Sequence, residues 1–455
     1  MRSTFYTYLP QYRAIIKLGV PIIMGQIAMV LLSICDTLMV GHYNTDSLAA
    51  SAFTGSLFYM PLMFCMGISL GFIPIAGACF GRNDKFEVGN LLRHAHVVNL
   101  IALIVLMIPM TILYFCLDYL GQPAELLPLV KPYYLCFLLS FPFISLYFTY
   151  KQFTDSITET KISMKIIVLG VVMNIVLNYL LIYGIYPFPE LGLLGAGIAT
   201  VIARVFMAVS YLFYIQFNHK YAIYQKGFRH GGFEFSKVRT MWKMGFPIAM
   251  QLLLEASSFS LTSIMAGWIG TIALAAHQIM LTFSQFFFMV YNGLGSALSV
   301  RISIFNGQKN LKGVKHTTNA GIQLMMGLFL FNAIVAFSTR NYIGVWFTEN
   351  DAVAMLIPMV MIPLIMYQAG DALQITYINV LRGLGDVKPI MWISMVCYLG
   401  ISLPISYICG ITFHWGLTGV WMGFPFSLSL AGIGYYLCYR QNLKKKDRWL
   451  DEKQM

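Results

Sequence analysis

The sequence predicts an all-α integral membrane protein with about twelve spanning helices arranged as two related halves. Of its 455 residues, 58% are hydrophobic and only 11% are charged, and the mean hydropathy is +0.71. A soluble domain carries about 25% charged residues, so this chain has too few to cover a surface that faces water. Its length accommodates about twelve helices of ~20 residues joined by short loops.

The expected spans are long apolar stretches separated by short polar segments. We place them at residues 15–40, 49–79, 92–116, 128–152, 162–184, 191–217, 242–268, 273–303, 316–338, 353–380, 388–411 and 415–438.

The basic residues indicate on which side of the membrane each loop lies. The formal net charge is +12, but lysines and arginines collect in alternate loops and in the tail from Arg440 to Lys453. The intervening loops carry almost none, apart from Lys131 and Arg340. This positive-inside pattern predicts a multi-pass protein of the cell (inner) membrane with both termini in the cytoplasm. The positive charge therefore reflects topology and contact with the lipid bilayer, and we expect no nucleic-acid partner.

The two halves of the chain repeat each other. The sequence KLGVP at residues 17–21 reappears as KMGFP at 243–247, and at the same offset Gly67 matches Gly293. Each half has six expected spans, an even number, so both halves enter and leave on the cytoplasmic side. The repeats are therefore expected to be parallel.

This repeat predicts three regions. An N-terminal lobe of six spans covers residues 1–217, a cytoplasmic linker covers 218–241, and a C-terminal lobe of six spans covers 242–455 and ends in a basic cytoplasmic tail. Parallel repeats of this kind place a substrate site between the lobes and suit alternating access. The organisation predicts a secondary transporter.

Three acids lie inside apolar stretches, namely Asp36, Glu255 and Asp371. A charge at the centre of a spanning helix costs about 2.5–3.5 kcal/mol. No lysine lies deeper in an expected span than its first or last four residues, so we expect no intramembrane lysine to neutralise them. The only basic residue that we place deeper within a span is Arg204, which we expect near the cytoplasmic end of its helix. We interpret the acids as cation-binding groups in a water-filled cavity. The structural alternative is that they stay protonated and hydrogen-bonded within the helix bundle.

Polar side chains accompany these acids at the spacing of one helical turn. The pairs are Gln251 with Glu255, Tyr367 with Asp371, and Asn174 with Asn178. Carboxylate, amide and hydroxyl oxygens are hard ligands, which suit Na+ as well as proton binding. For the amides alone, hydrogen bonding between helices is the alternative.

Catalytic motifs are not convincing in this sequence. The segment GISLG at residues 67–71 matches the G-x-S-x-G pattern of hydrolases, but it lies inside an apolar helix rather than on a strand-to-helix turn. We find no P-loop, and the eight cysteines form no C-x-x-C pair. We therefore expect no enzyme, no cofactor other than the coupling ion, no disulfide framework and no cysteine- or histidine-based metal site.

A family resemblance rests on particular segments. The sequence DTLMVG at residues 36–41, followed by LAA at 48–50, resembles the first-helix signature of the multidrug and toxic compound extrusion (MATE) family. RGLGD at 382–386 adds to the resemblance, which covers nearly the whole chain. Glu255 and Asp371 match the acids of the NorM-like branch, which the DinF-like branch lacks.

The resemblance implies a V-shaped two-lobe transporter that exports organic cations in exchange for Na+ or H+, and we expect it to be a monomer. The implied cation-binding residues are Glu255, Asp371, Tyr367 and Asp36, with Glu255 and Asp371 as the Na+ ligands. The implied substrate-binding residues and N-lobe polar cluster are Asp36, Asn174, Asn178, Thr200, Gln251 and Gln278. Some relatives have an aspartate in place of Asn178. We therefore expect Asp36, the only acid within a span of this lobe, to bind a proton or substrate.

Two other functions compete with this reading. A flippase for lipid-linked oligosaccharide has a similar fold, but it is expected to line its cavity with basic residues that hold pyrophosphate, whereas the candidate residues here are acidic. An intramembrane hydrolase would need a nucleophile and a base, and the sequence offers no credible pair.

Overall fold

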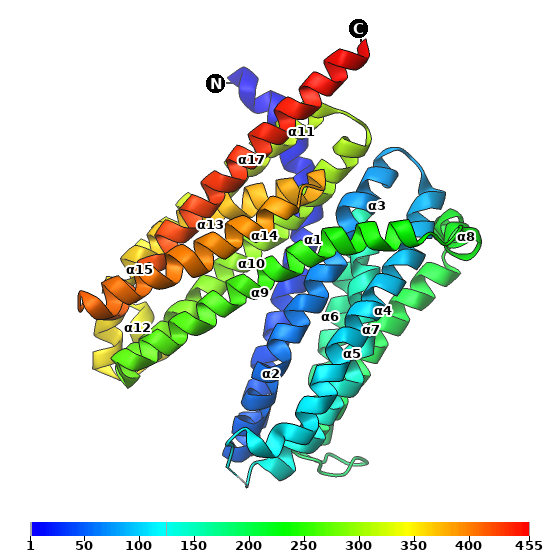
Figure 1. Cartoon of the computed structure of the whole chain (residues 1–455). Helices are drawn as coiled ribbons and strands as arrows, with labels where there is room; N and C mark the ends of the chain where they lie inside the picture. Colours follow the sequence, from blue (N-terminus) through cyan, green and yellow to red (C-terminus); the bar gives the residue numbers. More distant parts are fainter. Residues whose placement is uncertain (1, 124, 455) are drawn as a thin grey trace. The chain divides into compact units, whose positions relative to one another are not determined.

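A computed structural model describes residues 2–123 and 125–454, and their side chains from residue 8 to residue 447. Throughout these residues the regular structure is helical, without a β-strand (Figure 1). The helices are α1 Arg2–Tyr43, α2 Thr45–Leu70, α3 Phe72–Gly81, α4 Lys85–Cys116, η1 Leu117–Tyr119, α5 Leu127–Ser156, α6 Thr160–Ile182, α7 Leu193–Phe217, η2 His219–Tyr221, α8 Ala222–His230, α9 Phe235–Ile269, α10 Thr271–Gly307, α11 Leu311–Thr339, α12 Ile343–Phe347, α13 Asp351–Leu384, α14 Lys388–Ser394, η3 Met395–Ser402, α15 Leu403–Tyr407, η4 Ile408–Thr412, α16 Gly416–Trp421 and α17 Gly423–Gln454.

Twelve helical stretches of the described chain are long and apolar enough to cross a membrane, which confirms the predicted number. Each predicted span overlaps one of them. Most of the helices run further than their apolar segments predict, because polar residues continue the helix beyond the hydrophobic stretch. The third stretch, for example, begins at Lys85 where the apolar sequence begins at residue 92. Hydropathy locates the membrane-embedded part of a helix and not its ends.

The chain forms two compact units. Unit 1 contains the residues up to Ile23 and those from Met250 onward, and unit 2 contains Met24–Ala249. The boundaries fall inside α1 and α9, so the first part of each of these helices belongs to the unit formed mainly by the other half of the chain. The predicted lobes at residues 1–217 and 242–455 follow the sequence repeat instead, and that division stays a prediction.

Two equivalent glycine contacts hold the beginnings of α1 and α9 in their units. A Cβ atom on Gly67 would lie 2.3 Å from the Cα of Ala249, and a Cβ atom on Gly293 would lie 2.4 Å from the Cγ1 of Ile23. The two contacts are related by the offset of the sequence repeat. Gly67 therefore serves close helix packing, which explains the hydrolase-like pattern around it.

The turn that follows α3 in the first half recurs after α10 in the second half. Asn83 and Lys309, which correspond in the repeat, have φ angles of 61° and 55°. The next residue caps the following helix in both halves: Asp84 accepts a backbone N–H at 3.0 Å at the start of α4, and Asn310 accepts one at 2.8 Å at the start of α11. Short polar side chains at this position satisfy the free N–H groups of a helix N-terminus.

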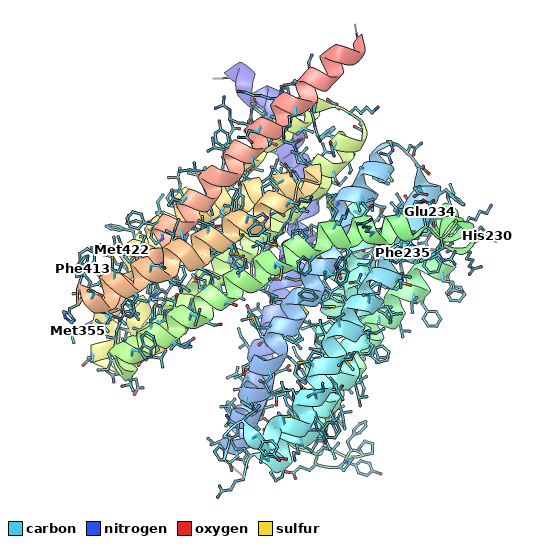
Figure 2. The ribbon with its side chains drawn as sticks, in the orientation of Figure 1. His230, Glu234, Phe235, Met355, Phe413 and Met422 are labelled. Carbon is cyan, nitrogen blue, oxygen red and sulfur yellow. The ribbon has the colours of Figure 1, made fainter. Side chains whose placement is uncertain are left out.

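The predicted linker, residues 218–241, forms η2, α8 and the first turns of α9 and packs against α4. A Cβ atom on Gly89 of α4 would lie 1.9 Å from the carbonyl oxygen of Tyr224 in α8, so only glycine permits this approach. The buried His94 accepts the backbone N–H of Glu234 at 2.9 Å. Glu234 and Phe235 mark the turn between α8 and α9 in Figure 2. The linker is thus fixed to unit 2 by backbone contacts.

Candidate functional site

A line of hydrogen bonds joins Glu255 to Arg382 within unit 1. Gln251 Nε2 donates to Glu255 Oε2 at 2.7 Å, and Gln251 Oε1 accepts from Arg382 Nη2 at 2.5 Å. Gln251 is 1% exposed and Arg382 is 7% exposed, so the amide and the guanidinium lie inside the protein. The guanidinium also interacts electrostatically with Glu255. One buried cation therefore partly balances this acid.

Arg382 corrects the prediction that no basic residue apart from Arg204 lies within a span. The sequence placed it in a loop beyond residue 380, but α13 continues to Leu384 and buries the side chain. Arg382 stands about three helical turns after Asp371, on the same face of the helix. The spacing from Asp371 is the sequence pattern from which the position of Arg382 within the helix could have been predicted.

Asp371 on α13 is the most deeply buried of the three acids, with 2% exposure. It interacts electrostatically with Glu255. The next turn carries Gln374, whose Nε2 donates to the hydroxyl of Tyr398 at 2.5 Å. Tyr398 lies near Glu255 and belongs to η3, a π-helical segment of the eleventh span. Such segments are frequent at functional sites, and no local sequence pattern predicted this one.

Several oxygen atoms of this cluster are left without a hydrogen-bond donor. Among the described residues, Asp371 Oδ2, Gln374 Oε1 and Ser258 Oγ are buried and have no hydrogen-bond partner. A buried polar atom in this state is costly unless a water or an ion completes its interactions. Carboxylate, amide and hydroxyl oxygens are also the ligands that hard cations prefer. The arrangement can therefore bind a small cation or a proton.

An aromatic wall lies beside this cluster. Tyr367, one turn before the α13 acid and 4% exposed, has ring centroids of Trp421 and Phe424 at 6.3 and 6.1 Å. The Trp421 indole N–H donates to His277 Nδ1 at 3.0 Å, and His277 Nε2 contacts Ser263 Oγ at 2.8 Å. Because an indole N–H can only donate, His277 Nδ1 must accept. The imidazole is therefore neutral in this arrangement.

The second cluster lies in unit 2, where Asp36 of α1 meets α6. Asn178 Nδ2 donates to Asp36 Oδ1 and lies 3.0 Å from Asn174 Oδ1. Both asparagines are at most 1% exposed. The structure thus brings together three of the polar residues predicted for this half. Thr200, which is 8% exposed, donates to the carbonyl of Ala196 in its own helix at 3.0 Å.

Arg204 belongs to the same region of unit 2 and corrects a second detail of the prediction. We expected it near the cytoplasmic end of its helix, but α7 spans Leu193–Phe217 and places it near the middle. Its Nη1 donates to Ser140 Oγ at 2.6 Å, and its guanidinium lies 5.0 Å from the centre of the Phe137 ring. It also interacts electrostatically with Asp36.

The remaining predicted residues fall outside the second cluster. Gln251, which we grouped with the N-lobe polar residues, contacts Glu255 in unit 1 instead. Gln278 of α10 is exposed. The other predicted amides are buried, whereas Gln278 lies outside the packed face of α10 that contains His277. In the part of the chain that the structure describes, no three histidine, cysteine or acidic residues form a metal-binding group.

Comparison with known proteins identifies relatives that match nearly the whole chain. The sequence profile of the MatE family matches residues 21–180 and 247–408, more than half of the chain. The chain is 29% identical over 442 residues to multidrug resistance protein NorM of Photobacterium profundum, an alignment that covers 94% of this chain and 95% of that protein. It is 27% identical over 446 residues to multidrug resistance protein NorM of Vibrio vulnificus, covering 96% of this chain and 98% of that protein.

Solved structures share the fold. The Vibrio cholerae MATE transporter VcmN in its bent form has a TM-score of 0.86 at 18% identity and covers 98% of this chain and 99% of its own. The eukaryotic MATE transporter AtDTX14 also has a TM-score of 0.86 at 18% identity, with 98% and 100% coverage. A MOP superfamily transporter from Pyrococcus furiosus, described as having a binding pocket of reverse polarity, has a TM-score of 0.85 at 18% identity and covers 96% of this chain and 97% of its own. These likenesses confirm the predicted fold class.

Proposed function

This chain belongs to the MatE family, and we propose that it is a secondary active antiporter that exports organic cations, including drugs, in exchange for Na+ or H+. The relatives named multidrug resistance proteins support drug export. The observation that carries cation coupling is the buried Asp371, whose Oδ2 has no hydrogen-bond partner among the described residues. A buried carboxylate in this position requires a cation or a proton to neutralise its charge and to complete its interactions.

In this proposal, Glu255, Asp371 and Tyr367 form the site of the coupling cation in unit 1. With both acids ionised, their mutual repulsion favours a hydrated site. A bound Na+ or proton removes that repulsion and lowers the cost of excluding water. Arg382 supplies one fixed positive charge beside Glu255 and limits how tightly the cation is held, so that it can be released.

An organic cation can neutralise the same carboxylates, so the drug and the coupling ion compete. Ion entry then expels the drug, and drug binding expels the ion. A membrane potential adds about 2.3 kcal/mol per charge per 100 mV to the inward movement of the ion. Export of a monovalent organic cation costs the same amount, so a one-for-one exchange is driven by the concentration gradient of Na+ or H+, and the potential contributes only when more than one ion enters for each cargo molecule.

Aromatic side chains favour flat, lipophilic monocations as cargo. Tyr367 lies one turn before Asp371, and its buried ring contacts the buried rings of Trp421 and Phe424. The face of an aromatic ring attracts a cation by about 0.5–2 kcal/mol. We therefore expect a cationic dye to be exported in preference to an anionic dye of similar size.

The polar cluster of unit 2 has a different part in this proposal. Asp36, Asn174 and Asn178 bind a proton or the substrate, because Asp36 is the only carboxylate of the cluster. Export of lipid-linked oligosaccharide is not favoured, since the two NorM relatives described above carry multidrug resistance names.

The twelve apolar helices and the family place the chain in a membrane as a multi-pass protein. Within that frame we propose that the protein is a monomer in the cell (inner) membrane. We also propose that both termini are cytoplasmic, because loops rich in basic residues alternate with loops that have almost none. Figure 1 supports a common side for the termini, since both ends of the chain lie at the same end of unit 1.

Transport measurements test the proposed function directly. The purified protein is reconstituted into vesicles that are loaded with a fluorescent organic cation, and Na+ and pH gradients are imposed separately. We expect at least one gradient to drive uptake or release of the dye in protein-containing vesicles only. Dye movement that is independent of both gradients would rule out antiport.

A further inference from the structure

A pocket of about 110 Å³ lies within unit 2, beside α8 and apart from both polar clusters. Its walls come from α4, α5, α7 and α8. The lining is mainly apolar, with polar groups at one side, and includes Leu92, Leu212, Ile215, Phe228, Gln225 and Arg229. None of the acids proposed to bind cations belongs to this lining.

The pocket lies where two spans reach the edge of the membrane. Leu92 is the first residue of the third predicted span, and Ile215 lies two residues before the end of α7. The last two turns of α7 also expose Phe213 and Phe217, by 59% and 70%. Large apolar side chains that gather on a surface mark contact with a membrane or a partner. On a membrane-spanning helix they face lipid, so the pocket borders the bilayer.

The position of α8 beside this boundary is fixed by contacts on two sides. Gln225 Nε2 donates to the carbonyl oxygens of Ile215 at 2.5 Å and of Gln216 at 2.9 Å. Both carbonyls belong to the last turn of α7, where a helix leaves such groups without an internal partner. Only glycine fits at position 227, because a Cβ atom there would lie 1.9 Å from the carbonyl oxygen of Phe86 in α4. The pocket is therefore held between packed helices.

The segment that forms one side of the pocket carries positive charge. Residues 218–230 contain Lys220, Lys226 and Arg229 and no acid. Lys220 pairs with Glu159. Arg229 is exposed, lines the pocket and has no hydrogen-bond or ion-pair partner among the described residues. The planar fork of a guanidinium suits a phosphate group, so Arg229 is available to an anionic ligand.

We propose that this pocket binds an anionic phospholipid. The phosphate of the lipid headgroup contacts Arg229, and part of an acyl chain lies against Leu212 and Phe228. Basic pockets between spanning helices at the membrane surface are suited to anionic headgroups. The same positive charge repels a cationic cargo, which distinguishes this pocket from a transport site.

Native mass spectrometry of the purified full-length protein tests the proposal, with phosphatidylglycerol and phosphatidylcholine of identical acyl chains as probes. We expect phosphatidylglycerol to bind more tightly. Arg229→Gln should weaken its binding by about fivefold, the effect of one basic residue near an anionic lipid, and Arg229→Lys should retain most of it. Lys226→Gln is the matched control, because it removes an exposed charge from the same helix outside the pocket. It should leave the preference intact.

Two further measurements test the acyl chain. Leu212→Trp fills the rim of the pocket without removing a charge and should weaken binding of both lipids. Glycerol phosphate, which has the phosphate but no acyl chain, should not displace phosphatidylglycerol.

Three results would overturn the proposal. Equal loss of phosphatidylglycerol binding in Arg229→Gln and Lys226→Gln would indicate attraction to general surface charge. Unchanged lipid binding by folded Leu212→Trp would exclude the pocket, and displacement by glycerol phosphate would indicate a site for a soluble phosphate. None of these measurements uses drug transport, so failure of the vesicle efflux experiment would count against the proposed function and not against the lipid site.

Discussion

The guanidinium of Arg382 and the side-chain amide of Gln251 are joined by a 2.5 Å hydrogen bond inside unit 1. Gln251 in turn donates to Glu255, so one side-chain amide contacts both the arginine and the acid. This relationship makes Arg382 part of the proposed cation site, although it has no direct ion pair with Glu255 among the described residues. It also leads to the first prediction.

Replacing Arg382 by Met should destabilise the protein by about 1–3 kcal/mol. The buried Gln251 Oε1 then loses its donor, and an unsatisfied buried acceptor costs that amount. Thermal unfolding in detergent measures the effect. Lys388→Met, which removes an exposed positive charge just beyond α13, is the matched control and should be neutral. Equal stability of the two variants would show that the hydrogen bond contributes nothing.

The acids of unit 1 should be required individually for coupling. Glu255→Gln and Asp371→Asn each remove one charge from the proposed cation site, so each should abolish gradient-driven efflux while the protein stays inserted and folded. Asp351→Asn serves as the control because Asp351 is an exposed acid at the start of the same helix as Asp371. Wild-type efflux rates in either folded site variant would exclude that acid from coupling.

Close packing of the linker should depend on Gly89. A methyl group there would lie 1.9 Å from the Tyr224 carbonyl oxygen. Gly89→Ala should therefore displace α8 and destabilise unit 2 by about 1–3 kcal/mol, as overpacking does. Faster amide hydrogen exchange in α8 would report the displacement. Gly327→Ala, whose Cβ would meet no atom within 4 Å, is the control and should not affect α8.

The turn between α8 and α9 should loosen in acid. The hydrogen bond and charge of Lys237 lower the pKa of Glu234 below its usual value of 4.5. A lowered carboxyl pKa stabilises the folded state above the unfolded pKa, and the stabilisation is lost as the pH falls through the folded pKa. We therefore expect loosening as the pH falls below about 4.5, where an unfolded glutamate is about half protonated.

Amide hydrogen exchange of residues 231–234 measures this effect at several pH values. Glu234→Gln is compared at each pH, so that the intrinsic pH dependence of exchange cancels. The ratio of the two rates should change only in the acid range. A ratio that stays constant from neutral to acid pH would show that the ion pair does not hold the turn.

The fold was predictable because it follows from patterns that one sequence contains. Apolar length predicted twelve spans, and matched glycines such as Gly67 and Gly293 predicted a repeat that reappears in helix packing. The cap residues Asp84 and Asn310 repeat the same turn in both halves. Helix ends were less predictable, because polar residues extend a helix without altering its hydrophobic signal.

The candidate site was predictable only in part. Buried acids and amides one turn apart, such as Glu255 and Gln251, can be found from spacing within a helix. Contacts between helices that are distant in the chain cannot be found in this way. Tyr398, which lies near Glu255, belongs to a π-helical segment of another span. Arg204 of α7 interacts electrostatically with Asp36 of α1, which is far from it in the sequence. Arg382 was misplaced because hydropathy alone ended its helix too early.

Binding competition tests the central claim most directly, namely that drug and coupling ion share the carboxylates of the protein. The affinity of the purified protein for a fluorescent organic cation is titrated in detergent, first at increasing Na+ and then at decreasing pH, and Na+ binding is titrated with and without the drug. Linkage requires that each ligand weaken the other by the same factor. We predict that Na+ or H+ weakens drug binding and that the drug weakens the binding of that same ion equally. Drug affinity that is unchanged by both saturating Na+ and low pH would contradict competition at shared carboxylates.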